Sequence, residues 1–257
     1  MPGKADGAYT PRADLLAGRV VLVTGAGDGI GRAAALAYAE HGADVVLLGR
    51  TERKLEAVFD LIESRTETRP VVVPADLEHA SEDAATILYH AIRREYGRLD
   101  GVLHNAGLLG PRTSIAEYPV SDWLEVMHVN VNAAFIVTRA LMPLLGESDD
   151  ASVVFTSSGV GRRGRAQWGA YAVSKFAVEG LMEVLADETA RAGRVRVNSL
   201  NPGATRTAMR AAAYPDEDPR ALPPPEDHMG LYLYLMGPDS RGITGQRFDA
   251  AAWSSPR

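Results

Sequence analysis

Tyr171 and Lys175 lie four residues apart in the run WGAYAVSKFAVEG, and Ser158 precedes them in VVFTSSGVG. Side chains at this spacing share one face of a helix, with Cβ atoms about 5–6 Å apart, so an ammonium group can act on a phenol through space. A free phenol has a pKa of about 10 and is a poor proton shuttle at neutral pH unless a neighbouring cation lowers that pKa. These residue types predict that Lys175 tunes Tyr171 as the proton donor to a carbonyl group. Ser158 would then hydrogen-bond the carbonyl oxygen, on which negative charge develops.

An isolated Tyr-x-x-x-Lys spacing also arises by chance, in which case the tyrosine packs and the lysine is a solvated helix residue. A second motif favours the chemical interpretation. The glycine-rich turn TGAGDGIG lies between the aliphatic run 20–23 and the alanine-rich stretch 32–40. Its glycines permit a tight turn and a close approach of the backbone, while the following helix offers free N–H groups to a pyrophosphate. A strand, this turn and a helix together predict a dinucleotide site.

Short, nearly continuous aliphatic runs recur along the chain and alternate with longer stretches of helical periodicity. The runs are 20–23, 45–48, 71–73, 102–103, 153–155, 195–200 and 243–248. Strands that are buried on both faces lose the alternation of polar and apolar residues, and strand–helix alternation is typical of a parallel sheet. The pattern predicts one α/β domain over residues 1–257. Its fold class is a doubly wound Rossmann fold, with a mostly parallel seven-stranded sheet and helices on both faces.

Ligands of such sheets bind beyond the carboxyl ends of the strands. The glycine turn follows the first predicted strand, and five more segments with polar or glycine residues follow the next five. They are Gly49 and Arg50, Asp76, Asn105 to Gly107, Ser158, and Pro202 with Gly203. We therefore expect all six segments to meet at one edge of the sheet.

The end of the second strand predicts which dinucleotide binds. A carboxylate there suits the ribose 2′-hydroxyl of NAD, and a basic residue suits the 2′-phosphate of NADP. This strand ends in Leu48, Gly49 and Arg50, and Arg50 can contact a phosphate through two hydrogen bonds. NADP(H) is the favoured cofactor and NAD(H) the alternative. Asp28, an acid inside the turn, opposes this preference, and Arg50 as a surface residue at a helix start is the other interpretation.

Taken together, these motifs resemble those of the short-chain dehydrogenase/reductase family, and the resemblance covers nearly the whole chain. The family motif T-G-x-x-x-G-x-G matches Thr24 to Gly31, N-A-G matches Asn105 to Gly107, the active-site asparagine matches Asn130 in HVNVNAAF, the serine matches Ser158, Y-x-x-x-K matches Tyr171 and Lys175, and P-G-x-x-x-T matches Pro202 to Thr207. Within the family, the runs LLGRTERKLE and DGVLHNAGLLG are most similar to the YciK-type bacterial oxidoreductases.

The resemblance implies an NADP(H)-dependent oxidoreductase that transfers hydride between nicotinamide and a carbonyl or secondary alcohol substrate. It implies a catalytic set of Asn130, Ser158, Tyr171 and Lys175, in which Asn130 orders a water of a proton relay and Lys175 also binds the nicotinamide ribose. Asp76 would contact adenine and Thr207 the nicotinamide carboxamide. The implied cofactor contacts are Thr24, Gly25, Asp28, Gly29, Ile30, Gly31, Arg50, Asp76, Leu77, Asn105, Ala106, Gly107, Tyr171, Lys175, Pro202, Gly203, Thr205 and Thr207.

Some residues near these motifs have two interpretations. Arg162, Arg163 and Arg165 lie between Ser158 and Tyr171, and they either contact an acidic substrate or belong to a solvated loop. Gln167 and Trp168 either line the pocket or pack elsewhere. The stretch 208–228, rich in proline and acidic residues in its second half, is a candidate substrate lid or a plain connector.

The amino-acid composition limits which ligands and partners we expect. A net charge of −6 gives no electrostatic footprint for nucleic acid, and the absence of cysteine excludes disulfides and zinc–thiolate sites. The six histidines show no metal-ligand spacing, so we expect no metal site. No apolar run approaches the length of a bilayer, and residues 1–17 read as a frayed lead-in without the apolar stretch of a signal peptide. We therefore expect a cytoplasmic protein without membrane contact.

Two expectations concern partners and activity. Apolar residues in the predicted helices around 129–145 and 176–185 suit a homodimer or homotetramer. The alternative to an enzyme is a regulatory protein that keeps the cofactor pocket with little turnover, because a fold does not dictate a function.

Overall fold

Seven parallel strands form a single sheet in the computed structural model, which describes residues 9–254. The strands are β1 (Val20–Thr24), β2 (Asp44–Gly49), β3 (Val71–Pro74), β4 (Gly101–His104), β5 (Ala151–Thr156), β6 (Val195–Asn201) and β7 (Arg247–Asp249). Their spatial order is β3-β2-β1-β4-β5-β6-β7, and every neighbouring pair is parallel. The predicted strand count and fold class are confirmed, with no antiparallel strand in the described sheet.

The strand order reverses between β1 and β4, which lie side by side with Leu22 opposite Val102. The chain winds outward to β2 and β3 on one side of this point and to β5, β6 and β7 on the other. Connections therefore leave in opposite directions above β1 and β4 and open a crevice at their carboxyl ends. All residues of β1 and β4 are buried, which explains the aliphatic runs 20–23 and 102–103 within them.

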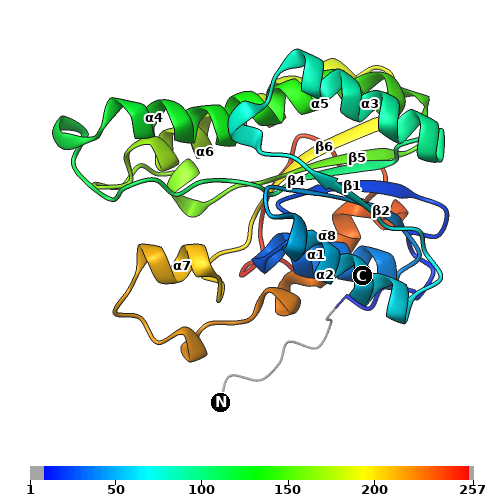
Figure 1. Cartoon of the computed structure of the whole chain (residues 1–257), viewed down its shortest axis with the longest axis horizontal. Helices are drawn as coiled ribbons and strands as arrows, with labels where there is room; N and C mark the ends of the chain where they lie inside the picture. Colours follow the sequence, from blue (N-terminus) through cyan, green and yellow to red (C-terminus); the bar gives the residue numbers. More distant parts are fainter. Residues whose placement is uncertain (1–8, 255–257) are drawn as a thin grey trace.

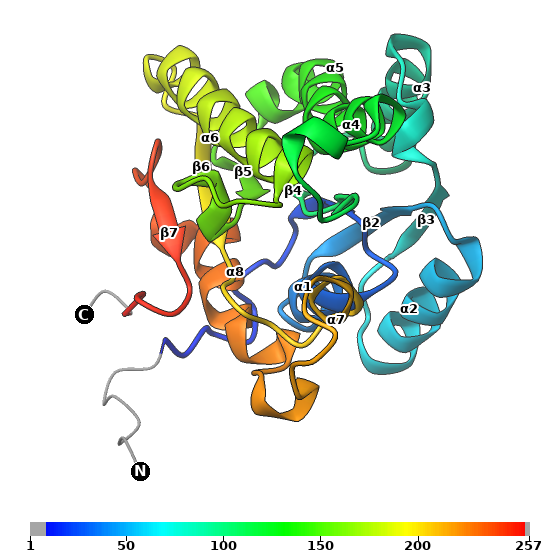
Figure 2. The same cartoon turned by 90° about the vertical axis from the view of Figure 1, so that its left-hand side faces the viewer.

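Helices cover both faces of the sheet (Figure 1). One face carries α1 (Gly29–Glu40), α2 (Glu52–Arg65) and α8 (Met229–Met236), and the other carries α3 (Glu82–Tyr96), α4 (Val120–Met127), α5 (Ala133–Glu147) and α6 (Gly169–Ala190). A short helix, α7 (Ala208–Ala213), stands apart from these layers where the chain leaves β6 (Figures 1 and 2). Single 3₁₀ turns lie at Leu77–His79, Ile115–Glu117, Gly159–Gly161, Pro219–Ala221, Pro225–His228 and Pro238–Ser240.

One helix is long enough to be compared with a membrane span. Helix α4, a π turn at His128–Asn132 and α5 run without a break over Val120–Glu147, which is long and apolar enough by composition to cross a bilayer. This corrects the expectation that no segment reached that length. Half of its most apolar window is buried inside the protein. Its π turn holds the buried amide side chain of Asn130, as in a core helix that serves a site.

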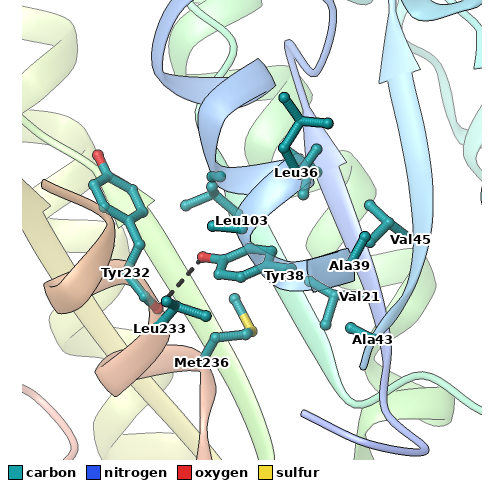
Figure 3. Close-up of a cluster of buried hydrophobic side chains, with 14 of the residues drawn as sticks. Val21, Leu36, Tyr38, Ala39, Ala43, Val45, Leu103, Tyr232, Leu233 and Met236 are labelled. Atoms are coloured by element: carbon teal, nitrogen blue, oxygen red, sulfur yellow. Dashed lines mark hydrogen bonds between the residues drawn. The ribbon is translucent and has the colours of Figure 1, made fainter. Parts of the chain in front are cut away.

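The face under α1 and α8 has an apolar core built around Tyr38 (Figure 3). The ring of Tyr38 is fully buried, and its hydroxyl donates to the carbonyl oxygen of Tyr232 on α8 at 3.5 Å. Leu36, Leu233 and Met236 belong to the same cluster. This contact ties α1, and with it the glycine turn that precedes α1, to the end of the chain.

Two element boundaries differ from the sequence-based prediction. The last strand spans only Arg247–Asp249, and the residues before it bond to β6 partly through side chains and partly through the backbone, where the Gly245 amide donates to the Val197 carbonyl oxygen. Thr244 Oγ1 accepts from the Val197 amide, and Asn198 Oδ1 accepts from the Gln246 amide. The expected lead-in 1–17 is also corrected where the structure describes it. Within 9–17, Leu15 and Leu16 are buried in the core, and residues 1–8 lie outside the described range.

We expect the folded protein to lose stability in acid, because His104 is buried at the end of β4. Its ring stacks on Phe155 with 4.8 Å between centroids, its Nε2 hydrogen-bonds Thr138, and burial lowers its pKa to about 3. The folded protein holds this histidine neutral, whereas the unfolded chain protonates it below about pH 6.5, so stability falls as the pH falls from that value. The loss by pH 5 should be about 2 kcal/mol, measured by denaturant unfolding at several pH values.

The matched variants for this prediction are His104→Gln and His90→Gln. His90 is exposed, so its variant should keep the pH dependence of the wild type. His104→Gln should be less stable at pH 7 but lose less on acidification, since half-buried His228 is left to act in the same direction. If the free energy of unfolding fell by the same amount between pH 7 and pH 5 in the wild type and in His104→Gln, His104 would contribute nothing to the loss of stability in acid.

Candidate active site

The glycine turn between β1 and α1 is closed tightly enough to exclude side chains. Gly25 has a φ of +68°, a left-handed conformation that glycine adopts without strain. A Cβ atom on Gly31 would lie 2.1 Å from the carbonyl oxygen of Gly25, so only glycine fits there. The Asp28 carboxylate caps α1 by accepting from the Gly29 amide at 2.7 Å. The turn is the cradle that a pyrophosphate requires at the start of a helix.

Thr24 and Asn105 join this turn to the loop after β4. The Thr24 hydroxyl oxygen accepts from the amides of Asn105 and Ala106, each at 3.0 Å, and donates to the carbonyl oxygen of Leu103. These bonds leave Thr24 buried behind the loop. The resemblance placed Thr24 among the cofactor contacts, but the structure places it in support of Asn105 and Ala106, which line the cleft.

Two adjoining cavities occupy the crevice beyond the strands. The inner cavity has a volume of about 300 Å³ and the outer one about 380 Å³, and both are lined by Gly25, Asp28, Ala106, Gly107 and Ala208. The inner cavity also collects Gly29, Ile30, Asn105, Ser158, Tyr171, Lys175, Pro202, Gly203, Thr205 and Thr207, and the outer one collects Arg50, Asp76 and Leu77. Segments from six strand ends therefore meet as expected. Among the expected contacts, Gly31 and Thr24 line neither of these two cavities.

The outer cavity carries two cations. Arg50 is exposed and forms no ion pair within the described residues. Lys54, on the first turn of α2, lies 2.5 Å from Asp28, and this hydrogen bond holds the pKa of the Asp28 carboxyl below its usual range. The acid inside the turn is thus neutralised by a lysine that sequence reasoning did not single out. Arg50 and Lys54 suit a phosphate group at this end of the cleft.

Tyr171 and Lys175 both lie on α6, and both are at least nine-tenths buried. The Lys175 ammonium donates to the carbonyl oxygen of Thr156 at 2.8 Å and lies 5.6 Å from the centre of the Tyr171 ring. Ser158, two residues beyond Thr156, lies close enough to Tyr171 to lower the pKa of its phenol. The end of β5 and the first turn of α6 therefore bring together the phenol, the hydroxyl and the ammonium.

The expected lowering of the phenol pKa is not found in this structure. Burial, the largest effect, raises the pKa of Tyr171, while the nearby Ser158 hydroxyl lowers it. Burial also lowers the pKa of Lys175 to about 8. Removing both groups from water disfavours both charged forms, and that cost exceeds the attraction expected from spacing alone. At neutral pH the phenol is therefore protonated, which is the state that a proton donor needs.

The Asn130 side chain links the loop after β4 to α6. Its two amide hydrogens donate to the Leu108 carbonyl oxygen and to Ser174 Oγ, each at 2.9 Å, and its oxygen accepts from the Leu108 amide at 2.7 Å. Ser174 follows Tyr171 by three residues on α6. The part that the resemblance implies for Asn130 in a proton relay stays a prediction.

Glu179 is a buried acid that sequence reasoning missed. It follows Lys175 by one helical turn, is 1% exposed, and raises the pKa of the Lys175 ammonium. Its carboxylate accepts from Ser157 Oγ at 2.5 Å, next to Ser158, and so fixes the end of β5. The Glu179 carboxylate also contacts Ser199, Arg162 and Arg247. The i, i+4 spacing between Lys175 and Glu179 was the sequence signal that could have identified this acid.

The wall opposite the glycine turn is apolar and aromatic. Trp168 is buried there, with its ring centre 5.7 Å from that of Tyr171 and 5.9 Å from that of Tyr214. Leu109, Met209 and Ala213 complete the wall. The structure therefore assigns Trp168 to the pocket wall, whereas Gln167 is exposed and outside the cavity lining.

The three arginines before Tyr171 separate into different roles. Arg162 is taken by an ion pair with Asp249 and a longer one to Glu179, so it is not available to a substrate. Arg163 is exposed. Arg165 is exposed and donates to the Tyr214 hydroxyl at 2.9 Å, beside the pocket wall. Between residues 9 and 254, no group of three or more His, Cys, Asp or Glu side chains could hold a metal ion.

Comparisons with known proteins identify the family of this chain. The short chain dehydrogenase family model matches residues 19–218. The oxidoreductase YciK of Escherichia coli K12 is 55% identical over 248 residues, which cover 96% of this chain and 98% of YciK. A crystal structure of a short chain dehydrogenase from Shigella flexneri 2a, complexed with NADP, has a TM-score of 0.91 and 55% identity, covering 93% of this chain and 100% of that one.

A second crystal structure, of a short chain dehydrogenase from Escherichia coli CFT073 complexed with NADPH, has a TM-score of 0.91 and 56% identity, covering 93% of this chain and 99% of that one. The similarity extends over nearly the whole chain, so it takes in the sheet, the glycine turn and the Ser158–Tyr171–Lys175 group. The chain belongs to the short-chain dehydrogenase/reductase family of oxidoreductases, and its similarity is to the YciK-type members.

Proposed function

We propose that this protein is an NADP(H)-dependent carbonyl reductase, which also runs the reverse oxidation of a secondary alcohol. The observation that carries the proposal is the grouping of Ser158, Tyr171 and Lys175 on the wall of the inner cavity, which adjoins the cavity that holds Arg50. A binding protein needs the cleft but has no use for a buried phenol, a hydroxyl and an ammonium at one point of it.

Each of the three residues has a separate task. NADPH, when bound, supplies the hydride that adds to the carbonyl carbon. Tyr171 donates its proton to the carbonyl oxygen, and Ser158 hydrogen-bonds that oxygen while charge develops on it. Lys175 then stabilises the phenolate left on Tyr171, because its ammonium lies 5.6 Å from the ring centre. The buried site keeps bulk water away from these groups.

The charge states favour reduction at neutral pH. Burial keeps the Tyr171 phenol protonated, ready to act as an acid, and the reverse oxidation needs the phenolate. Oxidation should therefore become faster as the pH rises, until Lys175 loses its proton near its pKa of about 8. This asymmetry follows from desolvation of the pair and not from the identity of the substrate.

NADP(H) is the cofactor that the cleft fits best. Arg50 and Lys54 supply positive charge in the outer cavity, and Lys54 cancels the charge of Asp28. The relatives crystallised with NADP and NADPH support the same choice. NAD(H) lacks the 2′-phosphate and would leave Arg50 without a partner.

Arg50→Ala is expected to weaken NADPH binding by about 10- to 100-fold, because a charge-assisted hydrogen bond to phosphate contributes about 1.5–3 kcal/mol. Dissociation constants from fluorescence titration provide the measurement. NADH affinity should stay within about twofold, since NADH has no phosphate at that position. Equal losses for both dinucleotides, or none for either, would remove Arg50 from the phosphate site.

A panel of aldehydes, ketones and oxo acids, assayed for NADPH oxidation, tests the proposal as a whole. The proposal expects at least one carbonyl compound to give its alcohol in a one-to-one ratio with NADPH consumed. The alternative is a regulatory protein that binds the cofactor without meaningful turnover. Tight NADPH binding together with no oxidation by any member of the panel would favour that alternative.

Three further features belong to the proposal. The segment 208–228 serves as a lid, since Ala208, Met209, Ala213 and Tyr214 line the inner cavity.

Exposed apolar side chains on α4, α5 and α6, among them Leu124, Phe135 and Phe176, support a homodimer or homotetramer that forms through these helices. Analytical ultracentrifugation would measure this oligomeric state. We also infer a cytoplasmic protein without membrane or nucleic-acid contact, in line with its acidic charge and absence of cysteine.

A further inference from the structure

The buried carboxylate of Glu179 joins helix α6 to two neighbouring strands of the sheet. One of its oxygens accepts from Ser157 Oγ at 2.5 Å, and the other accepts from Ser199 Oγ at 2.6 Å. Ser199 lies on β6, and Ser157 lies between the end of β5 and Ser158. Both oxygens accept hydrogen bonds, as those of an ionised carboxylate do. Glu179 therefore fixes the backbone next to Ser158 by contacts that run from α6 to the sheet.

Lys175 lies on the same face of α6, four residues before Glu179, so their Cβ atoms are about 5–6 Å apart. The Lys175 ammonium donates to the Thr156 carbonyl oxygen, and the Glu179 carboxylate accepts from the next residue, Ser157. The two charged ends therefore reach consecutive residues of the chain. Burial lowers the pKa of Lys175 to about 8, and the charge of Glu179 opposes that fall. Because both side chains are buried, water screens this attraction little.

Two arginines also approach Glu179, but each lies closer to another acid. The Nε atoms of Arg162 and Arg247 lie 3.5 Å and 3.4 Å from the Glu179 carboxylate. Arg162 forms a shorter ion pair with Asp249, and Arg247 forms one with Glu183 at 2.5 Å. Three acids and two arginines leave one negative charge in this group. The ammonium one turn earlier on α6 balances that charge.

Other ionisable groups around Lys175 are neutral or paired elsewhere. A very small cavity is lined by both His104 and Lys175, and His104 is neutral because burial lowers its pKa to about 3. Burial raises the pKa of Tyr171, so its phenol is protonated at neutral pH. Asp28 and Arg210 line the inner cavity with Lys175, but each forms an ion pair with a residue outside that lining. Within the described chain, Glu179 is therefore the acid best placed to act on the ammonium.

We propose that Glu179 is a positioning residue for the carbonyl reduction: its carboxylate keeps the Lys175 ammonium charged and holds the backbone beside Ser158 in place. This inference rests on the proposed function and adds a residue that acts through the catalytic group rather than on the substrate. Glu179 lines neither the inner nor the outer cavity, so substitutions of it leave the cavity walls in place.

The titration of Lys175 in the cofactor-free protein tests this role without any substrate. The chain has three lysines, so NMR of ¹³C-labelled lysine can follow Lys175, with Lys175→Ala to assign its signal. We expect a midpoint near pH 8 in the wild type and a midpoint about one pH unit lower in Glu179→Gln. Glu188→Gln is the same substitution at an exposed position of α6 and should leave the midpoint unchanged.

The rate constant for reduction in a single turnover should show the same shift. Glu179→Gln should lose little activity at about pH 6 and about fivefold at about pH 8, because a pKa lower by about one unit leaves less of Lys175 charged. Glu179→Asp keeps the charge, so its rate should fall at the same pH as that of the wild type, although its shorter side chain lowers the rate. A purely structural role would instead lower the rate of both variants by one factor at every pH.

An unshifted Lys175 midpoint in folded Glu179→Gln would overturn the inference, and so would a rate lowered equally at every pH. If Glu179→Gln does not fold, Arg247→Gln decides, since Arg247 is exposed and close to Glu179. Loss of this positive charge should raise the Lys175 midpoint by roughly 0.3 pH units, and no rise would contradict the inference. A wild type that reduces no carbonyl in the panel would instead contradict the proposed function, because the NMR midpoint does not depend on turnover.

Discussion

Replacing Tyr171 with Phe is expected to lower kcat for carbonyl reduction by about 10³-fold, because positioned general acids contribute about 10²–10⁴-fold and this phenol is the proton donor that we propose. The change removes one oxygen atom from a buried ring and leaves the packing against Trp168 in place. NADPH affinity and melting temperature should change little. Initial rates of NADPH oxidation with the best substrate of the carbonyl panel provide the measurement.

Tyr38→Phe is the matched control for that loss. Tyr38 also has a buried phenol, but its hydroxyl bonds the backbone of α8 (Figure 3), and Tyr38 lines neither cavity. The control should keep full activity and lose a modest amount of stability. If Tyr171→Phe kept a turnover within about threefold of the wild type, proton donation by Tyr171 would have to be abandoned.

Lys175→Ala is expected to lower kcat by about 10²–10³-fold, the range found when one preorganised electrostatic group is removed from an active site. The phenolate formed on Tyr171 would then face a buried site without its cation. The variant should still fold, since Lys175 donates a hydrogen bond only to the Thr156 carbonyl among the described residues, and its burial as a charge opposes folding. Thermal unfolding and initial rates measure the two effects separately.

Small amines offer a control within the same variant. Lys175 lines the inner cavity, so its removal opens space beside Tyr171 that ethylammonium can enter from the cleft. Part of the lost activity should return as ethylamine is added, and tetramethylammonium, which lacks N–H donors, should restore less. Full activity without any amine would show that the ammonium is dispensable.

The positions of the site residues follow from the sequence much better than their electrostatics do. Unbroken aliphatic runs mark the strands, and parallel strands end at one edge, so residues as distant as Arg50 and Gly203 can be assigned to one cleft from the sequence pattern alone. Direct contacts are harder to assign. Gly31 and Thr24 belong to the motifs, but neither lines the two cavities. Gly31 packs against the Gly25 carbonyl oxygen, and the Thr24 hydroxyl accepts a hydrogen bond from the Asn105 amide.

The pKa of Tyr171 could not be obtained from spacing. The i, i+4 rule places an ammonium near the phenol, but the pKa depends on how far both groups are removed from water, which only the folded environment decides. The pairing of Lys54 with Asp28 was missed for a related reason. The two residues are 26 positions apart in the chain, and no local period links them.

The pH dependence of hydride transfer in a single turnover tests the central claim most directly, with enzyme and NADPH premixed against the best carbonyl substrate. In the proposed mechanism, reduction needs a protonated Tyr171 and a charged Lys175, and the pKa of Lys175 is about 8. We predict a rate constant that is level through neutral pH and falls as the pH rises past about 8, with a low, level profile in Tyr171→Phe. A wild-type rate constant that stays level to about pH 10, or a Tyr171→Phe variant with the wild-type rate and profile, would contradict the account.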